Sequence, residues 1–356
     1  MKTIFHNKWI SGMLVVLPET EVLFEDEVAS YSFPERQTLR LKKVMGYEKH
    51  RIAKASTAAS DMCVYALRYA LEHDLISKEE IGAIIVVTVT PDHFMPHTAN
   101  VIQGECDIPS DVVCFDIMQG CCGFELGLMQ AFMLLDHMPG KKALLFNTDV
   151  LSHKVSLKDR NSYPLIGDAA SMTVVENDAK CRDIYFNMLM DGGKRDALTI
   201  PAGGSRLPCS SQTTEQVLDN EGNYRSLDNL KMNGAEIFSF VQTEVPPMIR
   251  ETLEYAGIGK EYVEWYLFHQ PNRFMLQKLV DRIGVPREKA PMNVVEKYGN
   301  PSGASIPLVI ADNLRSEMKK QKQLCCLSAF GAGMAWSAIV MELGDMKFCE
   351  LLISNC

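Results

Sequence analysis

Two adjacent cysteines, Cys121 and Cys122, stand where an apolar stretch gives way to a helical pattern, within DVVCFDIMQGCCGFELGLMQAFMLL (residues 111–135). A thiol at the first turn of a helix lies among unpaired backbone N–H groups at the positive end of the helix dipole, which favours the thiolate. Such a site brings a cysteine pKa from about 8.5 towards neutrality and makes the sulfur a nucleophile. Gly120 and Gly123 flank the pair, and glycines at such a turn allow a substrate to approach closely. The competing interpretation is structural, because buried cysteines commonly serve as small hydrophobic residues.

Two other loops carry side chains that complement a nucleophile. His269 follows an apolar stretch in FHQPN, and Asn300 lies in the turn GNPSGAS before a helical pattern. Taken singly, these are an ordinary loop histidine and an ordinary turn asparagine. In an α/β protein, however, loops at the same ends of neighbouring strands converge on one crevice. A cysteine, a histidine and an asparagine that meet there predict acyl transfer, in which sulfur attacks and two N–H donors stabilise a negative charge on a carbonyl oxygen.

The elements that must position these residues alternate between strand and helix along the first half of the chain. Short β-branched runs bounded by turn residues predict strands, and longer runs with helical periodicity predict helices. This alternation indicates an α/β fold whose central sheets are covered on both faces. The predicted strands are residues 12–17, 81–90, 112–117, 141–150 and 167–176, and the predicted helices are residues 57–75 and 123–135.

The second half repeats this order, so we predict two copies of one βαβ-type arrangement. We divide the chain into residues 1–176, with the cysteine pair, and residues 177–356, with His269 and Asn300 and an irregular cap at about 192–230. The predicted elements are a helix at 233–258 interrupted by Pro246-Pro247, a strand at 263–268, a helix at 273–283, a strand, loop and helix within 291–318, and strands at 323–330 and 334–343.

The composition limits the kinds of partner. With 356 residues, 47% hydrophobic, the chain can bury a large core. A net charge of -9 argues against a broad nucleic-acid or anionic-membrane surface. Eleven cysteines without zinc-type pairs predict a reducing cytoplasm and no metal site. No apolar run approaches the ~18 residues that a membrane span needs.

Five motifs in order carry a resemblance to a known family. DIMQGCCGF, GDAASMTVV, HQPN, YGNPSGASIP and FGAGMAWSAIVMEL resemble the successive signatures of the 3-oxoacyl-ACP synthase III family, within the thiolase superfamily. The resemblance runs from LPETEVLFEDE near the start to about Leu343. It implies a thiolase-like fold, with two duplicated halves layered αβαβα, a homodimer, and catalysis without metal or redox cofactor. The duplication agrees with the repeated order of elements.

Position by position, the resemblance assigns roles to the candidate residues. It implies that Cys121 is the nucleophile and that Cys122 replaces a small packing residue. It implies that His269 and Asn300 form the pair that supports malonyl decarboxylation. It also implies an oxyanion hole made by the backbone N–H groups of Cys121 and Ala332. Because the family has glycine at the latter position, the donor keeps its direction only if φ at Ala332 is negative.

The resemblance also suggests residues that bind substrate. Arg160 matches an arginine that contacts coenzyme A, Met95 stands where a phenylalanine lines the acyl pocket, and Asn272 belongs to the HQPN motif. The tryptophan and arginine that hold the adenine in acetyl-CoA-primed members have no counterpart, and Glu48 takes the arginine's place. The primer is therefore expected on either coenzyme A or acyl carrier protein (ACP).

An acidic chain that accepts an acidic carrier protein must present a local positive patch, because encounter would otherwise be repelled. Arg273 lies four residues after His269, within one residue of where the family places an arginine that contacts the carrier. We therefore expect Arg273 to anchor the carrier, with Arg250 and Lys260 extending the patch.

The function that these features favour is a decarboxylative Claisen condensation in fatty acid or related specialised lipid or polyketide synthesis. An acyl thioester loads on Cys121, malonyl-ACP loses carbon dioxide, and the resulting carbanion attacks the acyl group. One alternative is an acyltransferase that passes the acyl group to an alcohol or amine. Another is a non-catalytic partner subunit on the same fold.

Overall fold

Two β-sheets form the centre of the protein. A computed structural model describes all residues from 1 to 356. The first sheet has six strands in the order β17 (Phe348–Ser354), β2 (Lys8–Pro18), β8 (Ala169–Asn177), β7 (Lys142–Asp149), β5 (Ile81–Val87) and β6 (Val113–Ile117). The second has five, in the order β1 (Lys2–Phe5), β9 (Ile184–Met190), β16 (Ala335–Leu343), β15 (Gln323–Gly331) and β14 (Trp265–Phe268).

The sheets share a pattern, which confirms the predicted duplication. In each sheet a central strand, β8 or β16, runs antiparallel to both neighbours. On one side of each central strand, the next two strands are parallel to each other. These pairs are β7 and β5 in the first sheet and β15 and β14 in the second. Antiparallel neighbours with a parallel pair beyond them are a mixed sheet, which needs helical crossovers on its faces.

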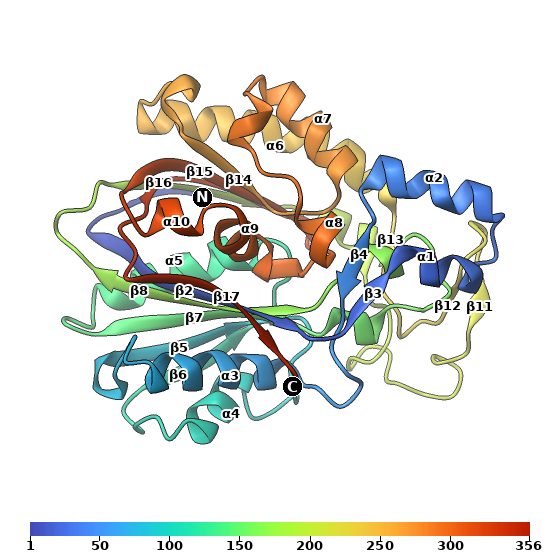
Figure 1. The fold of residues 1–356 in the computed structure, drawn as a ribbon, viewed down its shortest axis with the longest axis horizontal. Helices are drawn as coiled ribbons and strands as arrows, with labels where there is room; N and C mark the ends of the chain where they lie inside the picture. Colours follow the sequence, from blue (N-terminus) through green and yellow to red (C-terminus); the bar gives the residue numbers. More distant parts are fainter.

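Helices make three further layers, and Figure 1 shows the αβαβα arrangement from bottom to top. The predicted α/β layered fold is therefore confirmed. Helices α3 (Ala59–Glu72) and α4 (Thr98–Glu105) cover the outer face of the first sheet, α5 (Gly123–Leu135) and α9 (Ser305–Asn313) lie between the sheets, and α6 (Gly234–Ala256) and α7 (Arg273–Ile283) cover the second sheet. None of the helices is both long and apolar enough to cross a bilayer.

Helix α5 is apolar on nearly all sides because both sheets pack against it. The largest hydrophobic cluster lies between the sheets and contains Phe124, Leu128 and Phe132 from this helix. A Cβ atom on Gly123 would lie 2.5 Å from Val87 Cγ1, so the helix approaches the first sheet more closely than a side chain would permit. The first turn of α5, which follows the cysteine pair, is thus held firmly.

The first and the last strand each pair with a strand in the sheet of the other half of the chain. Strand β1 pairs with β9 in the second sheet, and β17 runs parallel to β2 in the first sheet. The division at 176/177 falls one residue before the end of β8, and the next strand, β9, lies in the other sheet, but the division does not provide for these exchanged strands. The segment after Leu343, for which we predict no element, is thus the outer strand β17. The ring of Phe348 there covers Gly12, where a Cβ atom would lie 2.3 Å from Phe348 Cζ.

Two predicted elements differ in the structure. Residues 291–298 were expected to begin with a strand, but Val294–Tyr298 forms the short helix α8, whose two consecutive valines are buried in two different hydrophobic clusters. Pro246 and Pro247 do not interrupt α6, which is continuous. Each proline removes a backbone donor, and burial of Val245, Met248 and Ile249 against the second sheet offsets that loss.

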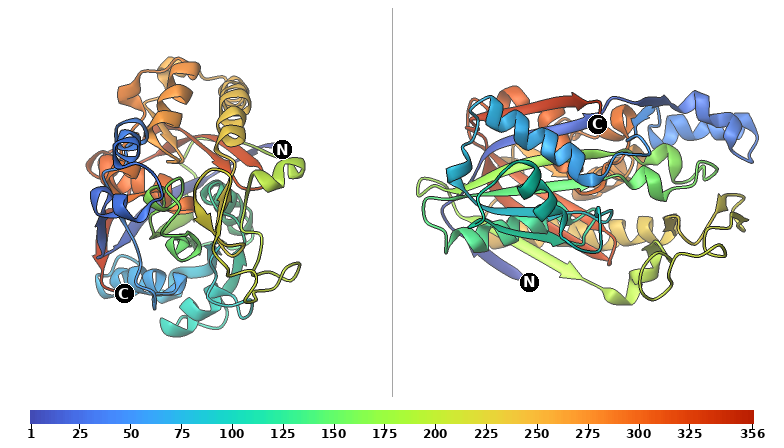
Figure 2. Two further views of the ribbon diagram at one scale, coloured as in Figure 1. Left: turned by 90° about the vertical axis from the view of Figure 1, so that its right-hand side faces the viewer. Right: turned by 90° about the horizontal axis from the view of Figure 1, so that it is seen from below.

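The remaining elements gather at one end of the molecule. Figure 2 shows α2 and the cap segment projecting together at this end. As expected, the cap at 192–230 is irregular, with only a short 3₁₀ helix and two-residue strands. The elements here are β3 (Glu21–Leu23), α1 (Phe24–Glu27), α2 (Glu35–Met45), β4 (Lys49–Arg51), β10 (Leu198–Thr199), β11 (Val217–Leu218), β12 (Tyr224–Arg225) and β13 (Lys231–Met232).

Candidate active site

Cys121 lies in the tight turn between β6 and α5. The N–H of Gly123 donates to the carbonyl oxygen of Gly120 at 2.5 Å, and the helix begins at Gly123. The end of β15 packs directly on the thiol, since a Cβ atom on Gly331 would lie 2.4 Å from Cys121 Sγ. Only glycine therefore fits at position 331, and the second sheet forms one side of the site.

The backbone N–H groups of Ala332 and of Cys121 itself lie close enough to the Cys121 sulfur to lower the pKa of this thiol. Ala332 is not among the residues with positive φ, so the condition for a donor at this position is met. The side chain of Gln119 donates from Nε2 to the Ala332 carbonyl oxygen at 3.0 Å, which holds this peptide in place. The structure thus directs both predicted oxyanion donors at the sulfur.

The expectation of a lowered cysteine pKa is wrong for this site. Burial raises the pKa of Cys121 to about 11, and the carboxyl groups of Asp149 and Glu125 act in the same direction. The two backbone donors lower the pKa but do not outweigh the loss of water. The resting group is therefore a thiol, and its proton must leave as the sulfur attacks.

Cys122 points away from this site into the core. It is fully buried, and its Sγ donates to the carbonyl oxygen of Ala335 at 3.1 Å. Burial raises the pKa of the Cys122 thiol well above its usual value. The two cysteines therefore have different environments, and the packing role expected for Cys122 agrees with its surroundings.

His269 follows β14 and is almost completely buried. Its Nδ1 lies 2.8 Å from Ser305 Oγ, and its ring meets Phe330 edge-on, with ring centroids 5.8 Å apart. Because Ser305 begins α9, which lies between the two sheets, the hydrogen-bonded imidazole edge faces the layer that also contains the cysteine turn. Burial lowers the pKa of His269 to about 3, although a backbone hydrogen bond with Ser302 opposes this. The imidazole is neutral and serves as a hydrogen-bond donor.

Asn300 is positioned by a close contact between two backbones. A Cβ atom on Gly167 would lie 2.0 Å from the Tyr298 carbonyl oxygen, so glycine is required there. The N–H of Asn300 donates to the Leu165 carbonyl oxygen at 2.7 Å. Its side-chain Oδ1 accepts the N–H of Ser302 at 3.0 Å, which leaves the NH₂ group to donate to a ligand.

Ser302 connects the three predicted residues, and the sequence analysis missed it. It adopts a positive φ of 50°, which is unusual for a residue other than glycine and costs about 1–3 kcal/mol. It binds the side chain of Asn300 and forms a backbone hydrogen bond with His269. A Cβ atom on Gly120 would lie 3.1 Å from Ser302 Oγ, which places this serine beside the cysteine turn. The sequence signal that could have indicated Ser302 is its position between Pro301 and Gly303 in a turn.

Asp149 is a second residue that the sequence analysis missed. It ends β7 and is buried, and its Oδ1 accepts hydrogen bonds from the Val89 N–H at 2.8 Å and from the hydroxyls of Thr88 at 3.0 Å and Thr90 at 3.2 Å. The Ser302 side chain also donates to it. Burial raises the pKa of Asp149 to about 6. A carboxylate at the end of a strand with the apolar run Ala143–Phe146 is the signal that marks it.

Glu125 is the third missed residue. It is fully buried, and neither carboxyl oxygen has a hydrogen-bond partner. It lies four residues after Cys121, and burial raises its pKa to about 8. Gly123 and Gly127 face the first sheet, so helical periodicity directs Glu125 to the second sheet. An acidic residue inside an otherwise apolar helix is the sequence signal.

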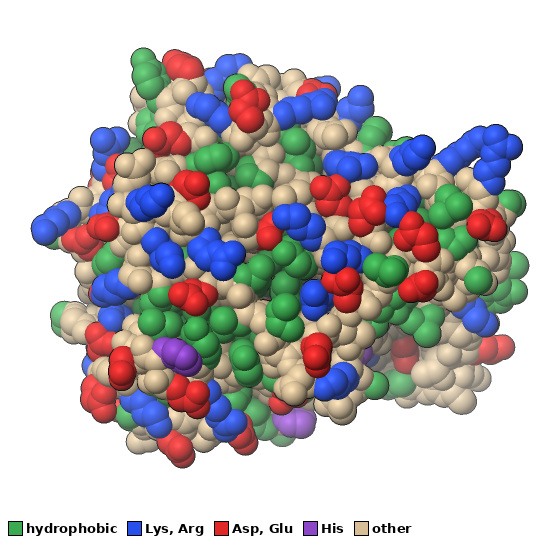
Figure 3. Space-filling view, in the orientation of Figure 1, with side chains coloured by type: hydrophobic (Ala, Val, Ile, Leu, Met, Phe, Trp, Pro, Cys, Tyr) green, Lys and Arg blue, Asp and Glu red, His purple; other side chains and the backbone are tan.

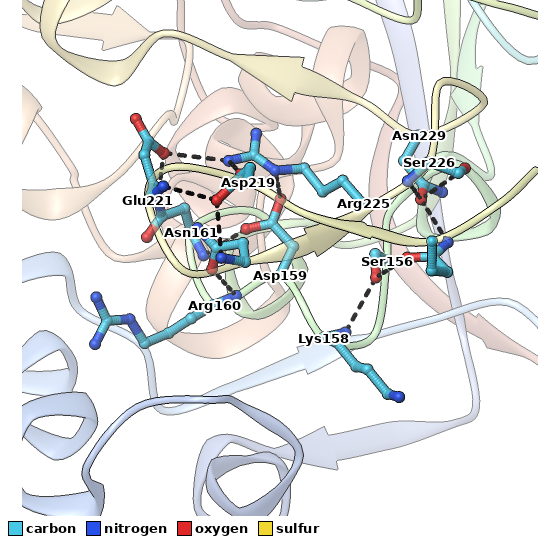
Figure 4. A network of polar contacts seen from close by, with 12 residues as sticks. Ser156, Lys158, Asp159, Arg160, Asn161, Asp219, Glu221, Arg225, Ser226 and Asn229 are labelled. Atoms are coloured by element: carbon cyan, nitrogen blue, oxygen red, sulfur yellow. Dashed lines mark hydrogen bonds and ion pairs between the residues drawn. The ribbon is translucent and has the colours of Figure 1, made fainter. Parts of the chain in front are cut away.

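Arg160 lies at the cap end, and its guanidinium stacks on the ring of Phe33, with Cζ 3.4 Å from the ring centroid. Its Nε and Nη1 are buried without a hydrogen-bond partner. Figure 4 shows the guanidinium pointing away from the polar network towards the segment that carries α1 and α2. Arg160 is five residues before Leu165, which binds Asn300, so it lies close to the loops of the site.

The network in Figure 4 fixes the cap against this loop. Arg225 on β12 pairs with Asp159 at 3.3 Å, Asp219 at 2.5 Å and Glu221 at 3.1 Å. The backbone N–H of Arg160 donates to the side chain of Asn223 at 3.0 Å. The cap therefore does not move independently of the loop that holds Arg160.

The surroundings differ from those expected for most of the other predicted residues, but not for Arg250. Met95 is 84% exposed, so it lines no pocket within its own chain. Asn272 caps α7, because its Oδ1 accepts the Met275 N–H at 2.8 Å. Of the predicted docking residues, Arg273 pairs with Glu296, Lys260 Nζ donates to the Gly284 carbonyl oxygen, and Arg250 is exposed without an ion pair.

Comparisons with known proteins identify the family. Residues 115–192 and 253–343 match the two parts of the family described as 3-oxoacyl-[acyl-carrier-protein (ACP)] synthase III. A protein of Campylobacter jejuni, provisionally named 3-oxoacyl-[acyl-carrier-protein] synthase 3, is 33% identical over 355 residues, which is 99% of each chain. The chain belongs to the 3-oxoacyl-ACP synthase III family. The beta-ketoacyl-[acyl-carrier-protein] synthase III of Microcystis aeruginosa is 31% identical over 86% of this chain and 89% of that protein.

A solved structure supports the same assignment for the fold. The 3-oxoacyl-(acyl-carrier protein) synthase of Burkholderia xenovorans LB400 superposes with a TM-score of 0.91 at 29% identity, over 99% of each chain. The match covers both sheets and all three helical layers. The thiolase-like fold that the five motifs imply for a 3-oxoacyl-ACP synthase III is confirmed.

Proposed function

We propose that this 3-oxoacyl-ACP synthase III-like condensing enzyme joins an acyl group held on Cys121 to a two-carbon unit taken from malonyl-ACP. One observation carries the proposal: two backbone N–H groups meet at the Cys121 sulfur, and Ser302 brings His269 and Asn300 to the same place. The site thus offers a nucleophile and two separate sets of donors. The steps use groups of this chain, its thioester substrates and one proton from water.

In the first half-reaction the Cys121 sulfur attacks the carbonyl carbon of an acyl thioester. The N–H groups of Cys121 and Ala332 stabilise the oxyanion that forms. The carbon–sulfur bond to the carrier breaks, and the carrier thiol leaves with the proton that Cys121 loses. Because burial disfavours a free thiolate, this proton transfer accompanies attack.

In the second half-reaction the malonyl thioester loses carbon dioxide, and the electrons of the broken bond form an enolate. The neutral imidazole of His269 and the NH₂ group of Asn300 donate hydrogen bonds to the enolate oxygen. The enolate carbon then attacks the acyl carbon on Cys121. The sulfur leaves as a thiolate, which takes a proton from water, and a 3-oxoacyl thioester remains on the carrier.

We propose that the acyl primer arrives on ACP rather than on coenzyme A. Phe33 already lies against the guanidinium of Arg160, the arginine that by resemblance would contact coenzyme A. Glu48 forms an ion pair with Lys42 at 2.7 Å, so this carboxylate is held at the same end of the molecule and would repel nucleotide phosphates.

We further propose that two copies of the chain form a homodimer through β6. This strand ends the first sheet, and an open strand edge is a template for pairing. Four apolar side chains near this edge are exposed to solvent: Val113 (43%), Phe94 (84%), Met95 (84%) and Met118 (73%). The two segments lie near each other, since the N–H of Thr98, three residues after Met95 at the start of α4, donates to the Asp116 carboxylate on β6 at 2.6 Å. Apolar side chains beside an open edge indicate a protein interface.

The free state of all eleven cysteines supports a cytoplasmic location.

Mass spectrometry of the intact protein tests the nucleophile and the primer together. The parent is incubated with acyl-ACP and acyl-CoA donors of matched chain length, and we expect loading from ACP at the higher rate. Cys121→Ala should abolish loading, and the matched variant Cys122→Ala should retain most of it. Loading that survives Cys121→Ala but not Cys122→Ala would reverse the assignment of the two cysteines.

Release of carbon dioxide from malonyl-ACP tests the second half-reaction. His269→Ala and Asn300→Ala should still form the acyl-enzyme, but we expect decarboxylation to fall by roughly 10²-fold or more, because each removes a donor to a developing oxyanion. Unchanged carbon dioxide release would show that these residues do not act in this step. A parent enzyme that loads and releases no carbon dioxide would favour the acyltransferase alternative, and one that never loads would favour a non-catalytic subunit.

A further inference from the structure

Helix α2 presents a row of cations to solvent that no carboxylate neutralises. Arg36, Arg40 and Lys43 are spaced by four and three residues, so they share one face of the helix. All three are exposed, and none forms an ion pair. Figure 3 shows Lys and Arg side chains gathered over α2, at the upper right of the molecule. We call these three residues the α2 basic stripe.

The stripe lies beside the loops of the active site. At its start, Phe33, two residues before α2, stacks on Arg160. At its end, the carbonyl oxygen of Lys43 accepts a hydrogen bond from Arg273 Nη2 at 2.7 Å, and Arg273 follows His269 by four residues. With 11 residues, α2 spans about 16 Å. The stripe therefore runs from the Arg160 loop to the start of the helix that follows His269.

The neighbouring cations are already bound within the chain. Arg273 Nη1 pairs with Glu296 at 2.8 Å, and Lys260 Nζ donates to the Gly284 carbonyl oxygen at 2.9 Å. Lys42, on the other side of α2, pairs with Glu25 and Glu48. An anion that bound any of these would have to displace an existing partner. The stripe offers positive charge without that cost.

We propose that the α2 basic stripe is the docking surface for the acidic carrier protein that brings the malonyl group. The inference rests on the proposed function and deepens it by replacing Arg273 with α2 as the anchor. A chain of net charge -9 repels an acidic partner at long range, so a local cluster of unpaired cations is needed to steer it. The stripe binds carboxylates on one helical face of the carrier, and this directs the pantetheine arm to the adjoining loops.

Charge reversal of the stripe, with a matched control, tests the proposal. The test variant is Arg36→Glu, Arg40→Glu and Lys43→Glu. The control is Arg315→Glu, Lys319→Glu and Lys320→Glu, at and after α10 (Arg315–Met318), which lies far from α2 in Figure 1. These three side chains are also exposed without ion pairs, so both variants change the net charge equally.

The measured quantity is KM for malonyl-ACP over a range of about 20 to 500 mM salt. We expect the stripe variant to raise KM at least about tenfold at low salt and to show a flatter salt dependence, while the control changes KM less than about threefold. Equal changes in the two variants would assign the effect to overall charge and overturn the proposal. So would a rise in KM for an acyl-CoA donor that exceeds the rise for malonyl-ACP.

Turnover of malonyl-pantetheine, which carries no protein, separates docking from chemistry. Failure of the parent to turn over either malonyl-pantetheine or malonyl-ACP would refute the proposed function. Direct binding of ACP to the parent and to the stripe variant would then test the docking surface, and equal affinities would overturn it. If the reversed variant does not fold, the neutral variant Arg36→Gln, Arg40→Gln and Lys43→Gln replaces it. About a threefold rise in KM for malonyl-ACP is then expected, and no rise would overturn the proposal.

Discussion

Replacing Glu125 with glutamine tests the energetic consequence of a carboxyl group buried one helical turn after Cys121. Neither oxygen of Glu125 has a hydrogen-bond partner, and the side chain has no exposed surface. An ionised carboxylate in such a place lacks both water and a counterion, so the protonated form is strongly favoured. Glutamine keeps the size and polarity of the neutral acid but has no proton to lose.

The size of the effect follows from the shifted pKa. Burial raises the pKa of Glu125 from 4.5 to about 8. Below the lower value the carboxyl is protonated in both the folded and the unfolded chain, so it adds no pH dependence. Between the two values the unfolded chain loses the proton while the folded chain keeps it, so the free energy of unfolding falls as the pH rises. Each pH unit between the two pKa values lowers the free energy of unfolding by about 1.36 kcal/mol. The whole interval therefore lowers it by roughly 5 kcal/mol, a loss that is complete once the folded group ionises.

Urea denaturation of parent and variant at about pH 5, 7 and 9 measures this difference. We expect Glu125→Gln to gain several kcal/mol relative to the parent between the lowest and the highest pH. The buried amide of glutamine costs about 1–3 kcal/mol at every pH, so the slope against pH is the decisive quantity. Other buried acids such as Asp149 are present in both proteins and cancel. Glu215→Gln, at an exposed position, is the matched control.

Parallel stability curves for the parent and Glu125→Gln would refute the reasoning. They would mean that Glu125 gains a partner or water in solution, because only a solvated carboxylate would titrate alike in both states. A slope difference that also occurred in Glu215→Gln would instead reflect the net charge of the protein.

Three further predictions concern packing around the site and the sheet edges. Gly331→Ala places a Cβ atom 2.4 Å from Cys121 Sγ, and we expect loss of acyl loading by mass spectrometry with an unchanged circular dichroism spectrum; normal loading would mean that the cysteine turn shifts freely. Gly12→Ala places a Cβ atom 2.3 Å from Phe348 Cζ, so the Tm should fall, and adding Phe348→Ala should recover part of the loss. Val113→Lys puts a charge on the open edge strand β6, and light scattering should show monomers; an unchanged dimer would place the interface elsewhere.

The predictable part of the site comes from local patterns. Cys121 and His269 follow strands with clear apolar runs, β6 and β14, and an α/β fold brings such loops together. Asn300 was expected in the same place for a partly wrong reason, since the segment before it is the helix α8 rather than a strand. Glycine positions also carried information, because a turn flanked by glycines indicates a close approach.

The unpredicted part depends on contacts between distant residues. The hydrogen bond from Ser302 to Asp149 joins positions about 150 residues apart, and no local pattern connects them. The pairing of Arg273 with Glu296 likewise follows from the packing of α7 beside α8, and it changes the expected docking surface. Burial, too, depends on the assembled sheets, which is why the pKa of Cys121 was expected to move in the wrong direction.

The exchange of terminal strands between the two sheets has a consequence during protein synthesis. Strand β2 needs β17 to cover its outer edge, but β17 is translated about 170 residues after β8 has completed the other side of β2. At a rate of about 5–20 residues per second, the edge stays open for roughly 10–30 s on the ribosome. During that time the strand presents the apolar run Met13–Leu17 with unpaired backbone groups to neighbouring nascent chains. The yield of folded enzyme should therefore depend on chaperones that protect this edge until β17 emerges.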